Sequence, residues 1–161
     1  MDPLDSVFHS FKLVVMIAFI ISFFLAFALM EGAAWSAHKY LMHGWLWKIH
    51  EDHHQPTGRT FQKNDLFFMI FAVPSWLCVM LGIIYSVPFS VGFGFGIAAY
   101  GIVYFLVHDV LIHRRFKWFD NTQNNYFKAI RKAHKVHHKN QHKEEGECFG
   151  MLIVPRKYFK Q

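Results

Sequence analysis

The stretch HKYLMHGWLWKIHEDHH, residues 38–54, decides how this chain must fold, because it places five histidines within seventeen residues. Their spacing is H-x4-H followed by H-x2-H-H, and the same order returns in HDVLIH, residues 108–113, and HKVHH, residues 134–138. Ten of the twelve histidines belong to this twice-written pattern: His38, His43, His50, His53, His54, His108, His113, His134, His137 and His138. Since neutral imidazole is the commonest ligand of transition metals, the pattern predicts a metal centre.

The spacings also predict how the rings can share metal ions. Positions i, i+3 and i+4 of an α-helix span about 100°, so the three rings of each H-x2-H-H motif share one face and can bind one metal or straddle two. The two positions of H-x4-H differ by about 140°. They reach a common centre only if the helix is distorted, for instance at a π-bulge, and otherwise serve different metals. Because first-row ions rarely take more than about six ligands, ten imidazoles predict two metal ions with four or five each.

Three long apolar runs accompany these motifs, at residues 13–30, 66–87 and 89–107. A helix of about 20 residues crosses about 30 Å of hydrocarbon, and each run is close to that length. Of the 161 residues, 53% are hydrophobic and 19% aromatic, more than a soluble domain usually contains. We expect an all-α integral membrane protein with about three transmembrane helices and additional interfacial helices, forming a single domain over residues 1–161. One long pass with a re-entrant hairpin is the alternative.

The distribution of the cations predicts the orientation in the membrane. Lys12 alone precedes the first run, whereas residues 31–65 contain four Lys or Arg residues and the tail after residue 108 contains twelve. Sixteen of the seventeen cations therefore lie on one face, which the positive-inside rule assigns to the cytoplasm. The N-terminus then lies outside, and the histidines converge on the cytoplasmic surface. Anionic headgroups are the expected partner of the basic tail, and nucleic acid is not needed to explain the net charge of +6.

Short polar segments mark the local boundaries. QPTGRT, residues 55–60, separates the first histidine cluster from the second apolar run. Asn64 or Asp65 is expected to cap the helix that follows. Residues 120–125 predict a polar turn, and YFKAIRKAHKVHH, residues 126–138, predicts a helix that lies along the membrane interface.

The ligand set indicates redox chemistry at a membrane surface. Nitrogen ligands with almost no carboxylate suit iron or another redox metal, and a lipid-soluble substrate suits this location. The sequence lacks a dinucleotide-binding fingerprint, since GFGFG, residues 92–96, lies inside an apolar run where Gly92 and Gly96 allow close helix packing. Electrons must therefore come from a separate partner. A membrane metal-binding or transport protein without oxygen chemistry is the non-enzyme alternative.

Two carboxylates lie close to the histidine motifs. Glu31 precedes His38 by seven residues, about 20° away on a regular helix and two turns nearer the membrane. We interpret it as an acceptor that orients a ligand or as an extra ligand, with an exposed interfacial glutamate as the alternative. Asp109 follows a histidine directly and either orients that imidazole or forms a salt bridge with Arg114 or Arg115.

The whole histidine pattern resembles that of the fatty acid hydroxylase superfamily of membrane di-iron oxygenases. Within this superfamily the chain is similar to the bacterial β-carotene hydroxylases, from about Glu31 to Pro155. The segments that carry the resemblance are HKYLMHGWLWKIHEDHHQP, NDLF, AYGIVYFLVHDVLIHRRF, AHKVHH and CFGMLIVP.

The resemblance implies a monooxygenase that hydroxylates the β-ionone ring of carotenoids at carbon 3, from β-carotene through β-cryptoxanthin to zeaxanthin. It implies two iron ions on the ten histidines, which zinc can replace during purification, O2 as the oxidant and a ferredoxin-type electron donor. It also implies a bacterial inner-membrane location and a carotenoid substrate taken from the lipid. A related hydroxylase, ketolase or desaturase acting on another carotenoid, a fatty acyl chain or a sterol is the nearest alternative.

Overall fold

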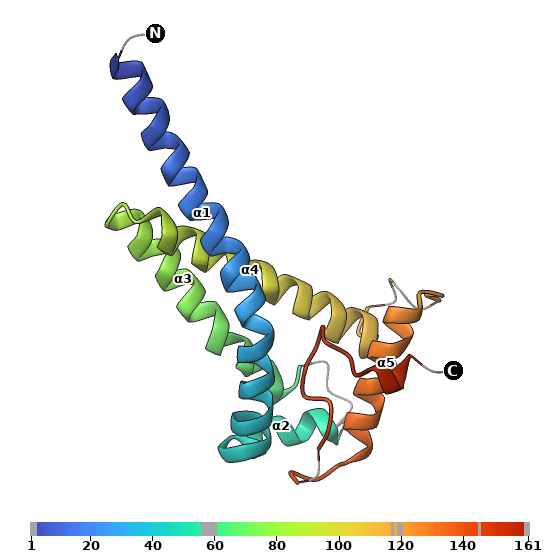
Figure 1. Ribbon diagram of the computed structural model, residues 1–161. Helices are drawn as coiled ribbons and strands as arrows, with labels where there is room; N and C mark the ends of the chain where they lie inside the picture. The colour runs from blue at the N-terminus through green and yellow to red at the C-terminus, as the bar shows by residue number, and fades with distance from the viewer. Residues whose placement is uncertain (1–2, 56–60, 117, 119–120, 145, 160–161) are drawn as a thin grey trace. The chain divides into compact units, whose positions relative to one another are not determined.

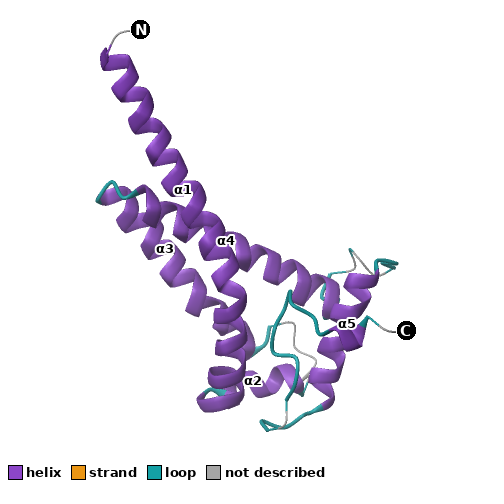
Figure 2. Ribbon diagram, in the orientation of Figure 1, coloured by secondary structure: helices purple, strands orange, loops and turns teal. Residues whose placement is uncertain are grey.

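The computed structural model describes residues 3–55, 61–116, 118, 121–144 and 146–159, and every element of regular structure within them is a helix (Figure 2). The predicted all-α class is confirmed. The α-helices are α1 (Pro3–Ser36), α2 (Trp47–His54), α3 (Met69–Ile84), α4 (Pro88–Phe105) and α5 (Asn125–Lys139). Two π-helices, η1 (Ala37–Trp45) and η3 (Leu106–Ile112), and two 3-10 helices, η2 (Lys63–Phe68) and η4 (Arg156–Tyr158), complete the set.

Three continuous helical stretches of the described chain are long and apolar enough to cross a membrane: Leu4–Trp45, Lys63–Ile84 and Pro88–Ile112. Their most apolar windows have mean hydropathies of 2.9, 2.3 and 1.8. They contain the three runs expected from the sequence, except for residues 85–87 at the end of the second run. The predicted class of integral membrane protein with three candidate spans is therefore confirmed.

The chain forms two compact units. Unit 1 comprises the described parts of Met1–Met30 and Met69–Gly101, and unit 2 comprises the described parts of Glu31–Phe68 and Ile102–Gln161. In Figure 1, unit 1 contains α3 and most of the blue helix α1 and the yellow helix α4, and unit 2 contains α2, α5 and the red C-terminal segment. Each of the ten pattern histidines belongs to unit 2.

Glycines let α4 pack closely against its neighbours in unit 1. A Cβ atom on Gly92 or Gly96 would collide with a backbone carbonyl oxygen of α1, that of Phe19 or Phe23 respectively. Gly94 faces α3, where a Cβ atom would lie 2.7 Å from the carbonyl oxygen of Ser75. Small residues at i and i+4 let two helix backbones approach. The interpretation of Gly92 and Gly96 as packing residues is confirmed.

Gly96→Ala is expected to destabilise unit 1, because the added methyl group must displace the backbone of α1. Overpacking of this kind costs about 1–3 kcal/mol. Gly101→Ala is the matched control, because a Cβ there meets nothing within 4 Å, and it should stabilise α4 by up to about 1 kcal/mol. Thermal unfolding in detergent measures both changes, and equal unfolding temperatures for the two variants would contradict the packing argument.

Unit 2 is held together by two small apolar clusters around α5. Val107, Leu111, Ile130 and Met151 form one cluster, which joins η3, α5 and the C-terminal segment. Ala129, Ala133 and Tyr158 form the other. These contacts bury one face of α5 and leave its lysines exposed, as the amphipathic pattern predicts.

Helix α5 confirms the helix expected over residues 126–138. It begins at an N-cap, Asn124, whose side-chain oxygen accepts hydrogen bonds from the backbone N–H groups of Tyr126 (2.9 Å) and Phe127 (3.3 Å). Of the expected turn over residues 120–125, residue 120 lies outside the described residues, as do residues 56–60 of QPTGRT. The expectations for residue 120 and for residues 56–60 therefore stay predictions.

Of the two candidates for the cap before the second span, Asp65 accepts a backbone hydrogen bond there and Asp52 supplies two more. Helix α3 is preceded by η2, and the carboxylate of Asp52 accepts hydrogen bonds from the backbone N–H groups of Lys63 (2.6 Å) and Asn64 (3.4 Å) at the start of η2. The side chain of Asp65 accepts from the N–H of Gln62. The side-chain oxygen of Asn64 does not cap the helix. It accepts a hydrogen bond from Nδ1 of the buried His50.

Candidate metal centre

Each H-x4-H pair is brought together by a π-helical turn. In η3 and its C-cap, the N–H of His113 donates to the carbonyl oxygen of His108 at 2.9 Å, an i→i+5 hydrogen bond. The other pair, His38 and His43, lies within η1. A π-turn widens the helix so that positions i and i+5 project to one side. The sequence left open whether the helices would be distorted or the pair would serve different metals, and the structure shows the distortion.

The ten histidines gather into two groups within unit 2. The ligand nitrogens of each group lie within 4.8 Å of one another. The first histidine group consists of His38, His43, His50, His54 and His137. The second histidine group consists of His53, His108, His113 and His134, and His138 joins it through Nε2, which lies 2.8 Å from Nε2 of His134.

Both H-x2-H-H motifs straddle the two groups. His50 and His54 belong to the first group while His53, between them on α2, belongs to the second. On α5, His137 belongs to the first group and His134 to the second. The two groups are adjacent, since the rings of His54 and His138 stack with centroids 4.5 Å apart. Each short helix thus contributes to both groups.

Hydrogen bonds at Nδ1 fix the orientation and tautomer of the rings. The Nδ1 atom of His38 lies 3.0 Å from the carbonyl oxygen of Phe149, and that of His50 lies 2.6 Å from Oδ1 of Asn64. An oxygen acceptor requires Nδ1 to carry the proton, which leaves Nε2 with a lone pair for a metal. The other Nδ1–acceptor pairs of this kind are His43–Lys143 O, His53–Gln62 Oε1, His54–Asn140 O, His108–Asp109 Oδ2 and His137–Glu147 O.

The Nε2 atoms face one another at distances that suit a shared cation. The Nε2 atoms of His38 and His50 lie 3.2 Å apart, and those of His53 and His108 lie 3.0 Å apart. Two lone pairs cannot hydrogen-bond to each other. Nitrogens about 2.1 Å from one metal are separated by roughly 3.0 Å at a right angle and roughly 3.4 Å at the tetrahedral angle. The donor set therefore fits a transition-metal ion in each group.

Burial keeps the imidazoles neutral, which is the form that binds metal. It lowers the pKa of His50 to about 2, those of His113 and His137 to about 3, and that of His54 to about 4. Neighbouring imidazoles lower these values further, because a second positive charge nearby is unfavourable. The pKa values of His53, His134 and His138 are lowered for the same reasons.

These lowered pKa values predict that the metal-free protein loses stability in acid. An unfolded histidine titrates near 6.5, so below that pH the unfolded chain binds protons that the folded chain rejects. The free energy of unfolding should fall by up to about 1.4 kcal/mol per pH unit for each such histidine, from about pH 6.5 towards about pH 4. Thermal unfolding of metal-free protein across this range measures the effect. The exposed His9 supplies a control, since His9→Ala should retain the slope and His50→Ala should reduce it; a flat profile for the unsubstituted chain would contradict the argument.

Sequence reasoning missed most of the groups that orient the histidines. The sequence favours Asn64 or Asp65 as a helix cap and gives Gln62 no role, and only Asn64 of the two orienting side chains lies in the NDLF segment that carries the resemblance. Four acceptors of the first group are backbone carbonyls between residues 140 and 149. Any residue type supplies such a carbonyl, so no side-chain signal marks these positions.

The two carboxylates singled out from the sequence lie outside both histidine groups. Oε1 of Glu31 accepts hydrogen bonds from the backbone N–H groups of residues 151, 152 and 153, at 2.9–3.0 Å. It thereby holds the segment that carries the Phe149 carbonyl, the acceptor of His38. Asp109 does both things considered for it, since one oxygen lies 3.2 Å from Nδ1 of the adjacent histidine and the other lies 3.0 Å from Arg115.

Asn64→Leu tests the orienting hydrogen bond of the first histidine group. The substitution nearly preserves volume and removes the acceptor of His50, so metal affinity should fall roughly 10- to 100-fold, as is usual when such a partner is lost. Titration of metal-free protein with iron(II) or cobalt(II) measures the change. Asn121→Leu, at an exposed position, is the control. Equal metal affinity in both variants would show that Asn64 does not orient the ring of His50.

The chain is similar to known proteins over most of its length. The model of the fatty acid hydroxylase family matches residues 23–155. A β-carotene hydroxylase of Pantoea ananas is 41% identical over 126 residues, covering 78% of this chain and 71% of the relative. One of Pseudescherichia vulneris is 38% identical, covering 78% and 70%. A chloroplastic β-carotene hydroxylase of Capsicum annuum is 36% identical over 143 residues, covering 83% of this chain and 45% of the relative. No solved structure matches the chain significantly.

Proposed function

The chain belongs to the fatty acid hydroxylase family, and on that premise we propose that it hydroxylates the β-ionone ring of carotenoids at carbon 3. β-Carotene would pass through β-cryptoxanthin to zeaxanthin. One observation carries the proposal: the similarity to β-carotene hydroxylases accompanies ten buried or half-buried histidines that form two adjacent groups. The family match includes parts of both units, which supports one functional domain over residues 1–161.

The two histidine groups would hold an iron pair. When bound, iron supplies the activation of O2 and the removal of a hydrogen atom from the substrate. The chain's own contribution is to present neutral imidazoles whose Nε2 atoms converge, with Nδ1 of most rings held by an oxygen. Zinc competes well for such nitrogen sites, so purified protein can carry zinc in place of iron. Electrons would come from a ferredoxin-type donor.

The choice of carbon 3 requires control by position. Carbon 4 of the ring is allylic and has the weaker C–H bond, so intrinsic reactivity favours the wrong carbon. A reacting atom must be held within about 3–3.5 Å of the oxidant for placement to override reactivity. The protein's task is therefore to fix the ring relative to the histidine groups and to exclude water.

The membrane location follows from the three candidate spans, and a carotenoid would enter from the lipid. We place the chain in a bacterial inner membrane with its N-terminus outside and its histidines on the cytoplasmic side, because sixteen of seventeen cations follow the positive-inside pattern. The exposed lysines of α5 would contact anionic headgroups. A fatty acyl substrate, as in the family's description, is the nearest alternative, and another carotenoid or a sterol is a further one.

Pigment analysis of a β-carotene-producing bacterium that expresses the chain tests the proposal. The unsubstituted chain should yield zeaxanthin, and His50→Ala should yield none because the first histidine group loses a ring. His9→Ala, an exposed histidine outside both groups, should behave like the unsubstituted chain. If β-carotene stays unchanged although the protein is in the membrane and iron is supplied, the carotenoid assignment is wrong, and extracted fatty acids and sterols should then be analysed for new hydroxyl groups.

A further inference from the structure

Two rings of the second histidine group are oriented by side chains rather than by backbone carbonyls. Nδ1 of His53 lies 3.0 Å from Oε1 of Gln62, and Nδ1 of His108 lies 3.2 Å from Oδ2 of Asp109. These two rings meet at Nε2, 3.0 Å apart. Their geometry therefore depends on what holds Gln62 and Asp109.

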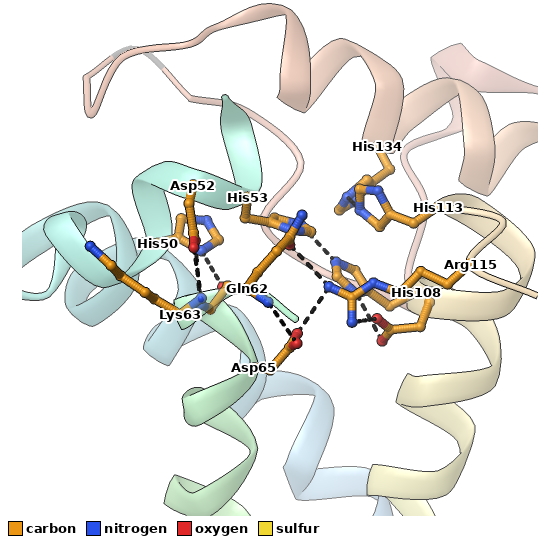
Figure 3. A network of polar contacts seen from close by, with 12 residues as sticks. His50, Asp52, His53, Gln62, Lys63, Asp65, His108, His113, Arg115 and His134 are labelled. Carbon is orange, nitrogen blue, oxygen red and sulfur yellow. Dashed lines mark hydrogen bonds and ion pairs between the residues drawn. The ribbon is translucent and has the colours of Figure 1, made fainter. Parts of the chain in front are cut away.

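A single guanidinium holds both acceptors. Nη2 of Arg115 donates to Oε1 of Gln62 at 3.0 Å and lies 2.9 Å from Oδ1 of Asp65, while Nη1 lies 3.0 Å from Oδ1 of Asp109. Figure 3 shows Arg115 beside His108, with dashed contacts leading towards Gln62 and Asp65. Because arginine only donates, it also requires the oxygen of Gln62, and not its NH2 group, to lie between Arg115 and His53.

The local backbone fixes where this guanidinium lies. The π-helix η3 ends at Ile112 with His113 as its C-cap, and Arg114 has a left-handed conformation with φ of 52°. The N–H of Arg115 then donates back to the carbonyl oxygen of Asp109 at 2.9 Å. Its side chain is 25% exposed and that of Asp109 is 14% exposed, so the contacts are partly shielded from water.

We propose that Arg115 is a positioning residue for the second histidine group, acting through Gln62 and Asp109 to set the rings of His53 and His108. This inference rests on the proposed metal centre. The planar fork of arginine can hold two acceptors at fixed angles, whereas lysine offers a point charge on a flexible stem. Arg115→Lys therefore keeps the charge and loses the positioning.

The test is a cobalt(II) titration of the metal-free, full-length protein in detergent. The unsubstituted chain should bind two equivalents, which His38→Ala and His134→Ala assign to the first and second groups by removing one each. In Arg115→Lys the second-group equivalent should bind roughly 10- to 100-fold more weakly, while the first-group equivalent and the helical content of the metal-free protein stay unchanged. Arg156→Lys, at an exposed position, is the control and should match the unsubstituted chain.

A second variant separates positioning from a role in folding alone. In Arg115→Ala, guanidinium ion at a non-denaturing concentration should restore part of the second-group affinity, because it returns the donors to the same place. The inference about Arg115 would be overturned, and the proposed metal centre would stand, if Arg115→Lys left the second-group affinity for cobalt(II) unchanged. Equal weakening of both equivalents with no rescue by guanidinium would have the same meaning. Failure of the unsubstituted chain to bind two equivalents would overturn the proposed metal centre and this inference with it.

Discussion

The fold of unit 2 depends on holding neutral imidazoles so close that their Nε2 lone pairs face one another. Separations of 3.0–3.2 Å between such atoms are unfavourable without a cation between them. Two features keep the rings neutral and their Nε2 lone pairs free for a metal. Burial prevents the rings from taking up protons, and an oxygen at Nδ1 fixes the tautomer of most of them.

The two histidine groups meet the same requirement in different ways. In the first group, four of the rings use backbone carbonyls between residues 140 and 149, and Glu31 binds the backbone N–H groups of residues 151–153, which follow this segment. In the second group, the side chains of Gln62 and Asp109 act as acceptors and Arg115 holds them both. Every residue type supplies a backbone carbonyl, so these acceptors tolerate substitution. A network of hydrogen-bonded side chains requires particular residues at each position.

Much of this could be predicted from the sequence, and the part that could not has physical causes. The apolar runs and the twice-written spacing were sufficient for the helical class, the three spans and the set of ten histidines. Helical periodicity could not decide whether H-x2-H-H binds one metal or straddles two, because both choices place the three rings on one face. The π-turns were one of two open alternatives, since a regular helix separates His38 from His43 by about 140°. The role of Asn64 was missed because the same residue type caps helices and accepts from buried rings.

The straddling arrangement on α5 has a consequence for biosynthesis. Ribosomes deliver the chain from its N-terminus, and neither histidine group is complete until His134 and His137 have emerged, with the carbonyls of residues 140–149 following. All three spans are therefore synthesised before either group is complete, and an interrupted chain that ends before α5 lacks part of each. A complete set of imidazoles for either group is thereby available only once nearly the whole polypeptide exists.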